Sequence, residues 1–173
     1  MRIREAFRFL TVLPLPGEAA RSPRDVAGAV VYFAAVGAAL GLALGLLDRL
    51  LLLALSPRLS AVIVTLGWAA LTGGLHLDGV ADTADGLFGG RTPERRLEIM
   101  RDSRVGTYGA LALVGLVLLK VSLLAEVPVP WRLRGLVLAG VLGRWAIAHA
   151  IVTHAPARAE GLGRFFQEHT TSG

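Results

Sequence analysis

Four long apolar segments constrain this chain more than any other feature of its sequence. A helix that crosses a bilayer needs about 20 mostly apolar residues, because each residue adds about 1.5 Å across a hydrocarbon core about 30 Å thick. The segments that approach this length are Val26–Leu47, Leu59–Leu75, Gly109–Ala125 and Gly135–Val152. We therefore predict an all-α, polytopic membrane helical bundle with about four spanning helices, forming one integral membrane domain over residues 1–173.

The residues before the first segment predict a further, amphipathic helix. Apolar side chains recur at helical spacing from Ile3 to Leu10, arginines fill the other face, and Pro14 ends the pattern. Such a helix suits the membrane interface, where it lies flat. Packing against the helical bundle is the alternative that this pattern leaves open.

The arginines are sorted by connection, which predicts an orientation in the membrane. Five precede the first apolar segment, five lie between the second and third, and two follow the fourth, whereas only four lie in the other connections. The positive-inside rule then places both termini and the central segment 76–108 in the cytoplasm. This distribution explains the formal net charge of +5 without nucleic acid as a partner.

Local patterns predict how the helices pack and where they begin and end. Gly37, Gly41 and Gly45 recur at every fourth position, which favours close approach of a second helix backbone. Thr72-Gly73-Gly74 indicates that the second apolar segment unwinds at its end. Thr92-Pro93-Glu94 is a helix start, so a short cytoplasmic helix is expected over Pro93–Arg101.

Three aspartates follow the second apolar segment at positions i, i+4 and i+7: Asp78, Asp82 and Asp85. In a helix they project from one face, where their mutual repulsion favours a divalent cation. Mg²⁺ prefers carboxylate oxygens and commonly bridges to substrate phosphates. We predict that these three bind Mg²⁺, with Asp82 or Asp85 alternatively accepting a proton from an attacking hydroxyl. The competing interpretation is a set of solvated carboxylates.

A second group of polar residues lies just before the third apolar segment. Arg101, Ser103, Arg104 and Thr107 carry donors for phosphate oxygens, although arginines at this boundary also follow from topology alone. Asp102 either joins the catalytic carboxylates or orients one of the arginines.

Charged and polar side chains near or inside the apolar segments complete the candidate site. Lys120 and Arg144 lie within the third and fourth segments, where a charged group usually faces a cavity or a partner. We expect them to line a cavity for an anionic substrate. His76, at the start of the central segment, is a separate candidate for substrate binding. Structural pairing of these charges is the alternative.

Two stretches resemble a known family closely. They are Gly73–Gly86 (GGLHLDGVADTADG) and Arg95–Gly109 (RRLEIMRDSRVGTYG), and Phe9–Pro16 is similar to the family's N-terminal motif except that Val12 stands where an arginine is usual. The chain resembles cobalamin synthase, the adenosylcobinamide-GDP ribazoletransferase, over nearly its whole length. Members of that family are usually longer, so we expect this sequence to be the N-terminal part of a longer fold, with residues 76–108 as its catalytic loop.

The resemblance implies a reaction, a cofactor and a location. α-Ribazole or its 5′-phosphate attacks adenosylcobinamide-GDP, GMP leaves, and cobalamin or its 5′-phosphate forms, with Mg²⁺ as the expected cofactor. The matching acidic positions are Asp78, Asp82, Asp85 and Asp102. We expect a multi-pass protein of the cell inner membrane with no nucleic-acid partner, and self-association stays open.

Two other classes of function compete with this interpretation. One is another Mg²⁺-dependent membrane transferase that uses a diphosphate-activated donor, but Asp78-Gly79-Val80-Ala81-Asp82 differs from the CDP-alcohol phosphotransferase pattern, and a prenyltransferase would carry two acidic motifs. The other is a transporter of ions or solutes. Transporters place charged sites near the midplane of the membrane, whereas the charge here is densest in segment 76–108.

Overall fold

The computed structural model describes residues 2–17, 23–158 and 161–170, and within these ranges the chain contains helices and no strands. It is an all-α protein, as the apolar segments predict.

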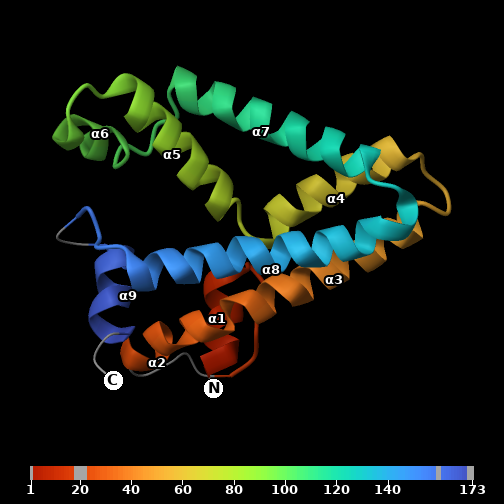
Figure 1. Cartoon of the computed structure of the whole chain (residues 1–173), viewed down its shortest axis with the longest axis horizontal. Helices are drawn as coiled ribbons and strands as arrows, with labels where there is room; N and C mark the ends of the chain where they lie inside the picture. The colour runs from red at the N-terminus through yellow and green to blue at the C-terminus, as the bar shows by residue number, and fades with distance from the viewer. Residues whose placement is uncertain (1, 18–22, 159–160, 171–173) are drawn as a thin grey trace. The chain divides into compact units, whose positions relative to one another are not determined.

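The chain divides into two compact units, one formed by Met1–Leu53 with Val129–Gly173 and the other by Ala54–Pro128. In the first unit the elements are α1 Arg2–Leu10, α2 Pro23–Ala27, the 3₁₀ helix η1 Gly28–Tyr32, α3 Phe33–Leu51, α8 Val129–Thr153 and α9 Leu162–Thr170; in the second they are α4 Pro57–Leu71, α5 Leu75–Gly89, α6 Pro93–Ile99 and α7 Thr107–Glu126 (Figure 1).

Three helical stretches of the described chain are long and apolar enough to cross a membrane: Arg24–Leu51, Thr107–Glu126 and Val129–Thr153. A fourth candidate is the pair α4 and α5, which together pass the same test but bend by 88° at their junction. The protein is therefore a polytopic membrane helical bundle. The second predicted span differs from a simple helix, because it is either a broken span or a re-entrant loop.

The first unit is built on α3 and α8, which run antiparallel and lie side by side in Figure 1. A Cβ atom added to Gly37 would meet the backbone of Gly140, and one added to Gly41 would lie 2.6 Å from the Cα atom of Val137. At Gly45 the neighbour is Leu133, at 3.0 Å. The prediction that this glycine series permits close helix packing is confirmed, with α8 as the partner.

A buried ion pair continues the same contact towards the C-terminal end of α3 and the N-terminal end of α8. Nη2 of Arg132 lies 2.8 Å from Oδ1 of Asp48, and both side chains are 1% exposed. Arg132 is one of the four arginines counted above in the other connections, and it lies in the first turn of α8. Helix α8 begins at Val129, because Pro130 is tolerated within the first helical turn, where its missing N–H needs no partner.

An aromatic cluster joins α1 and α9 to the start of α3. Phe9 stacks on Phe33 with 5.7 Å between ring centroids, and Phe166 meets both rings edge-on at 5.2 and 6.2 Å. The predicted helix over Ile3–Leu10 is confirmed, and its Ala6 and Leu10 are buried. Packing against the bundle thus accounts for its apolar face, while its location at a membrane interface stays a prediction.

The second unit begins with the broken helix pair. Helix α4 ends at Leu71, and Gly73 and Gly74 take φ values of +61° and +70°, a region that favours glycine. The carbonyl of Gly74 then accepts the amides of Leu77 and Asp78, which starts α5 in a new direction. The predicted unwinding at Thr72-Gly73-Gly74 is therefore confirmed.

Segment 76–108 is mainly helical and packs within the second unit. Helix α5 packs against α6 and α7, and α7 also lies along α4. Thr92 caps α6 by accepting the amide of Arg95 at 3.3 Å, so the predicted short helix is confirmed, although it ends at Ile99. The segment expected as a catalytic loop thus presents its side chains mostly from helices.

The close contact of α3 with α8 predicts that a larger side chain destabilises the protein at a glycine in the contact but not at a glycine outside it. Gly41→Leu should destabilise the chain by about 1–3 kcal/mol, because the side chain would force two backbones apart. Gly143→Leu on α8 is the matched control, since nothing lies within 4 Å of a Cβ there. Thermal unfolding in detergent micelles measures both; equal shifts would contradict this packing.

The Asp48–Arg132 pair predicts strong non-additivity. Arg132→Met alone should cost about 3–5 kcal/mol, because it leaves a carboxylate buried opposite an apolar side chain. Adding Asp48→Leu should recover most of that loss, since an apolar pair often replaces a buried ion pair without penalty. A double-mutant cycle on unfolding free energies measures the coupling, and simple additivity would exclude a direct interaction.

Candidate active site

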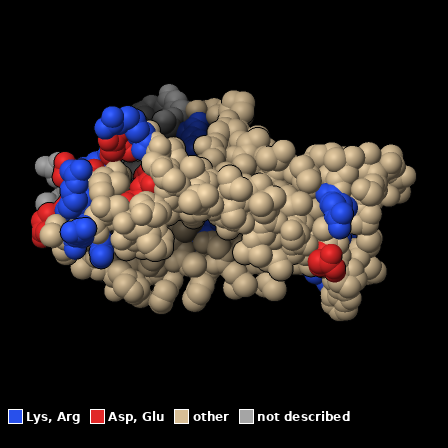
Figure 2. All heavy atoms as spheres, turned by 90° about the horizontal axis from the view of Figure 1, so that it is seen from above, with Lys and Arg blue, Asp and Glu red and all other residues tan. Residues whose placement is uncertain are grey.

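Charged side chains of the second unit gather on α6 and on the turns that precede and follow it. Figure 2 shows arginine and acidic side chains grouped at the end where α6 lies. The three aspartates of α5 approach this end along one helical face, as predicted. Their surroundings differ, because Asp78 is exposed, Asp82 is partly buried and Asp85 is buried at 8% exposure.

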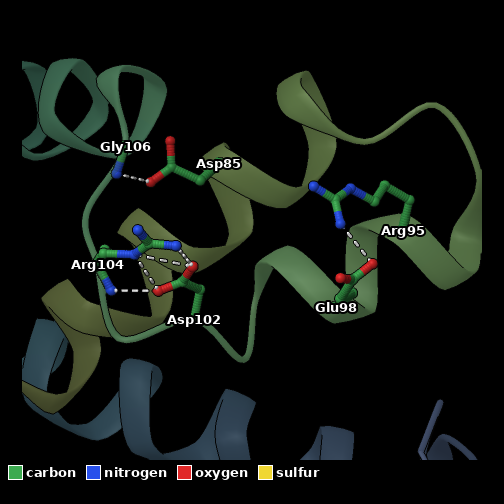
Figure 3. Close-up of polar contacts among 6 residues, drawn as sticks. All are labelled: Asp85, Arg95, Glu98, Asp102, Arg104 and Gly106. Carbon is green, nitrogen blue, oxygen red and sulfur yellow. Dashed lines mark hydrogen bonds and ion pairs between the residues drawn. The ribbon is translucent and has the colours of Figure 1, made fainter.

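Asp85 contacts the beginning of α7 through both carboxylate oxygens. Oδ2 accepts the backbone amide of Gly106 at 2.7 Å, the contact drawn in Figure 3, and Oδ1 accepts that of Gly109 at 2.8 Å. The first amides of a helix have no partner within the helix, and the helix dipole favours a negative charge at this end. Asp85 therefore caps α7 from a different helix.

The two glycines are required by this close contact. A Cβ atom on Gly106 would lie 2.5 Å from Oδ1 of Asp85, and one on Gly109 would collide with Oδ2. Gly106 has extended backbone geometry that other residues adopt, so its need for glycine is steric. The structure therefore uses both glycines to admit a carboxylate.

Asp102 and Arg104 form a pair at the turn that precedes α7. Nη2 of Arg104 donates to Oδ2 of Asp102 at 2.7 Å, and both Nε and the backbone amide of Arg104 donate to Oδ1 at 3.0 Å (Figure 3). These hydrogen bonds lower the pKa of Asp102 from 3.8 to about 2 and raise the pKa of Arg104. This pairing is what the arginine-orienting role of Asp102 predicts, and its catalytic role stays a prediction.

An open pocket of about 740 Å³ lies among α5, α6 and the start of α7. Its lining combines arginines and carboxylates with the ring of one tyrosine. The lining residues are Asp85, Gly89, Arg95, Glu98, Ile99, Arg101, Asp102, Arg104, Val105, Gly106, Thr107 and Tyr108. Four predicted substrate or catalytic positions, Arg101, Asp102, Arg104 and Thr107, thus share one pocket with Asp85. Ser103 is exposed on the same turn.

Sequence reasoning missed three charged or aromatic side chains of this pocket, those of Arg95, Glu98 and Tyr108. Arg95 and Glu98 form an ion pair of 2.6 Å on α6, and the ring of Tyr108 lies 5.6 Å from that of Phe88 (Figure 3 shows the ion pair). Arg95 and Glu98 are three residues apart on a helix that the sequence does predict. That spacing could have placed them on one face, but not beside the start of α7.

His76 and Lys120 also come together, in a different part of the second unit. Nζ of Lys120 lies 2.9 Å from Nε2 of His76, whose Nδ1 lies 3.4 Å from Oγ1 of Thr72. Because a lysine ammonium only donates, Nε2 accepts and Nδ1 carries the ring proton. Their contact fixes α5 to α7 just after the helix break, and their role in substrate binding stays a prediction.

Arg144 belongs to α8 in the first unit and is partly buried. Its expected cavity with Lys120 therefore stays a prediction, as does its role in binding an anionic substrate.

The carboxylates of α5 are the candidate ligands for Mg²⁺. Among the described residues, no group of three or more His, Cys, Asp or Glu side chains lies close enough to hold a metal ion. Asp78 and Asp82, one helical turn apart, suit the mode in which Mg²⁺ takes one or two carboxylates and completes its shell with water and substrate phosphate. The assignment of Asp78, Asp82 and Asp85 as metal ligands stays a prediction.

Comparison with known protein families identifies the family of this chain. Residues 2–173 match the family described as cobalamin-5-phosphate synthase. The chain belongs to this family. The resemblance drawn from the central motifs is therefore confirmed, and the cobalamin-5-phosphate synthase match includes the α5 carboxylates, the pocket and both units of the structure.

Curated relatives of the chain agree with the family match. Proteins named adenosylcobinamide-GDP ribazoletransferase are 44% identical in a Roseiflexus species, over 99% of this chain, and 43% identical in Herpetosiphon aurantiacus, over 96%. One with the same name in Clostridium acetobutylicum is 37% identical over 95% of this chain. The chain spans 63% to 66% of the length of these relatives. No solved structure matches it.

The lowered pKa of Asp102 gives a pH prediction. Because its folded pKa lies below the ordinary value, its pairing contributes stability that is present above about pH 4 and is lost as the pH falls through about 2. Arg104→Gln should return the pKa of Asp102 towards 3.8. Carboxyl ¹³C NMR titration of the chain in micelles measures this shift, and a pKa unaffected by the substitution would contradict the pairing.

Proposed function

We propose that the protein is a membrane transferase that joins α-ribazole or its 5′-phosphate to adenosylcobinamide-GDP and releases GMP. The product is cobalamin or cobalamin 5′-phosphate. The family and the names of the relatives support this activity, although the chain spans only part of their length. The observation that carries the proposal is the arginine-lined pocket of the second unit, which adjoins the aspartate face of α5.

The pocket has the chemistry that a diphosphate requires. Arg95, Arg101 and Arg104 line it, and arginine binds phosphate oxygens through paired donors. The hydrogen bonds to Asp102 favour one orientation of the Arg104 guanidinium, so less conformational freedom is lost when a phosphate binds. The N–H groups of Arg104 that do not bind Asp102 are then available to a phosphate in the pocket, and Arg101 adds a second positive charge there.

The aspartates of α5 supply the acidic half of the mechanism. Asp78 and Asp82 would hold Mg²⁺ together with substrate oxygens, and the bound ion would neutralise negative charge on the diphosphate. In the reaction, a hydroxyl oxygen of α-ribazole forms a bond to the phosphorus on the cobinamide side. The bond from that phosphorus to the oxygen of the leaving GMP breaks, and Asp82 accepts the hydroxyl proton.

The arginine distribution supports an orientation for this site. We place both termini and segment 76–108 on the cytoplasmic side of the cell inner membrane, because these parts of the sequence carry twelve arginines and the other connections carry four. The nucleotide donor and α-ribazole would then reach the pocket from the cytoplasm.

Release of GMP tests the proposed reaction. The chain in lipid nanodiscs, given adenosylcobinamide-GDP and α-ribazole, should release GMP and form cobalamin in a Mg²⁺-dependent manner. Asp82→Asn should lower the rate about a hundredfold or more, because it removes both a metal ligand and a proton acceptor. Asp25→Asn, in α2 of the first unit, is the matched control and should change the rate less than about twofold.

A second pair of variants tests the pocket itself. Arg101→Gln should raise KM for the donor, whereas Arg91→Gln, which removes the same charge outside the pocket lining, should not. If the chain releases no GMP, it should be extended with the C-terminal segment of the Roseiflexus relative and assayed again. Absence of GMP release from the extended chain would exclude the transferase.

A further inference from the structure

We propose that Asp85 is a positioning residue that ties the arginine-bearing turn to α5, and that it does not bind the metal. This inference rests on the proposed function for the identity of the reacting groups. It departs from the sequence-based expectation that all three aspartates of α5 serve as ligands. Its evidence is the direct contact of the Asp85 carboxylate with two backbone amides.

Each carboxylate oxygen of Asp85 already accepts a hydrogen bond from one backbone amide. The amides of Gly106 and Gly109 approach at 2.7 and 2.8 Å, distances typical of hydrogen bonds to an ionised acceptor. The two amides belong to the first turn of α7, so they have no acceptor within their own helix. Moving the carboxylate to a metal would leave these partly buried amides without it, which costs free energy.

Steric fit provides a second, independent argument. Gly109 is buried, and its missing side chain leaves space that the carboxylate of Asp85 and the carbonyl of Ala81 occupy. Gly106 contributes a similar gap on the other side of the carboxylate. A metal-binding carboxylate needs room for the ion and its waters, whereas Asp85 is only 8% exposed at the edge of the pocket and its oxygens lie against the backbone of Gly106 and Gly109.

The contact links the two halves of the proposed active site. Asp82 lies one turn before Asp85 on α5, and Arg104 lies two residues before Gly106. The Asp85 contact therefore fixes the separation between the acidic face and the arginines, and it acts on substrate only through them. A shift of about 1 Å between such groups can reduce a rate about a hundredfold.

Amide hydrogen exchange of the whole chain in nanodiscs tests the contact without any activity. Asp85→Asn should speed exchange over residues 103–110 about tenfold, because the side-chain amide can accept only one of the two donors well. Asp82→Asn is the matched control and should change exchange there less than about twofold. Equal rates in wild type and Asp85→Asn would overturn the proposal.

Mg²⁺ itself separates positioning from metal binding. In the wild-type chain, millimolar Mg²⁺ should leave exchange over residues 103–110 unchanged, because the amides keep their carboxylate. Faster exchange on adding Mg²⁺ would show that Asp85 leaves the amides for the ion, and would overturn the proposal. This readout gives the same answer whether or not the chain releases GMP, so the two proposals fail separately.

Gly106→Ala provides a variant that keeps every carboxylate. It should speed exchange over residues 103–110, because its Cβ would displace the Asp85 side chain. In the GMP assay, Gly106→Ala and Asp85→Asn should each lower kcat with unchanged half-saturation by Mg²⁺, and together should lower it no further than either alone. Unchanged exchange in Gly106→Ala, or additive losses of kcat, would overturn the proposal even if Asp85→Asn failed to fold.

Discussion

The hydrocarbon core of a membrane offers no hydrogen-bond partner to a backbone amide or carbonyl, and this constraint shapes the whole chain. It requires helices through the apolar segments, and it makes each interruption of a helix a place where polar groups need partners from nearby. The break between α4 and α5 meets this need through the carbonyl of Gly74, which accepts two amides of the next helix. At the start of α7, beside the open pocket, the carboxylate of Asp85 accepts two backbone amides that have no partner within their own helix.

Polar and charged side chains in this protein stabilise particular contacts between helices. Asp48 and Arg132 pair where α3 meets the start of α8, and Lys120 meets His76 where α7 passes the beginning of α5. Because a charge left alone in an apolar environment is costly, such pairs favour one register of the two helices over others. The glycine contact of α3 adds to this in the first unit, since it brings the two backbones close enough for the short Asp48 side chain to reach Arg132.

Several features of the fold and site could be predicted from the sequence because they depend on neighbours within one helix. The spans follow from length and hydropathy, the cap at Thr92 from its spacing to Pro93, and the shared face of Asp78, Asp82 and Asp85 from helical periodicity. The different surroundings of those aspartates could not be predicted in this way. Asp85 contacts residues 21 and 24 positions further along the chain, and spacing within α5 carries no information about them.

The sequence by itself determined that the chain is helical, that it crosses a membrane several times, and to which family it belongs, because these depend on composition, local periodicity and a specific motif. Only the tertiary structure decided that Asp102 orients Arg104, that Arg95 and Glu98 line the pocket, and that Asp85 caps α7. The physical reason is that identical carboxylates differ only in what surrounds them. Those surroundings come from helices that are distant in sequence and adjacent in space.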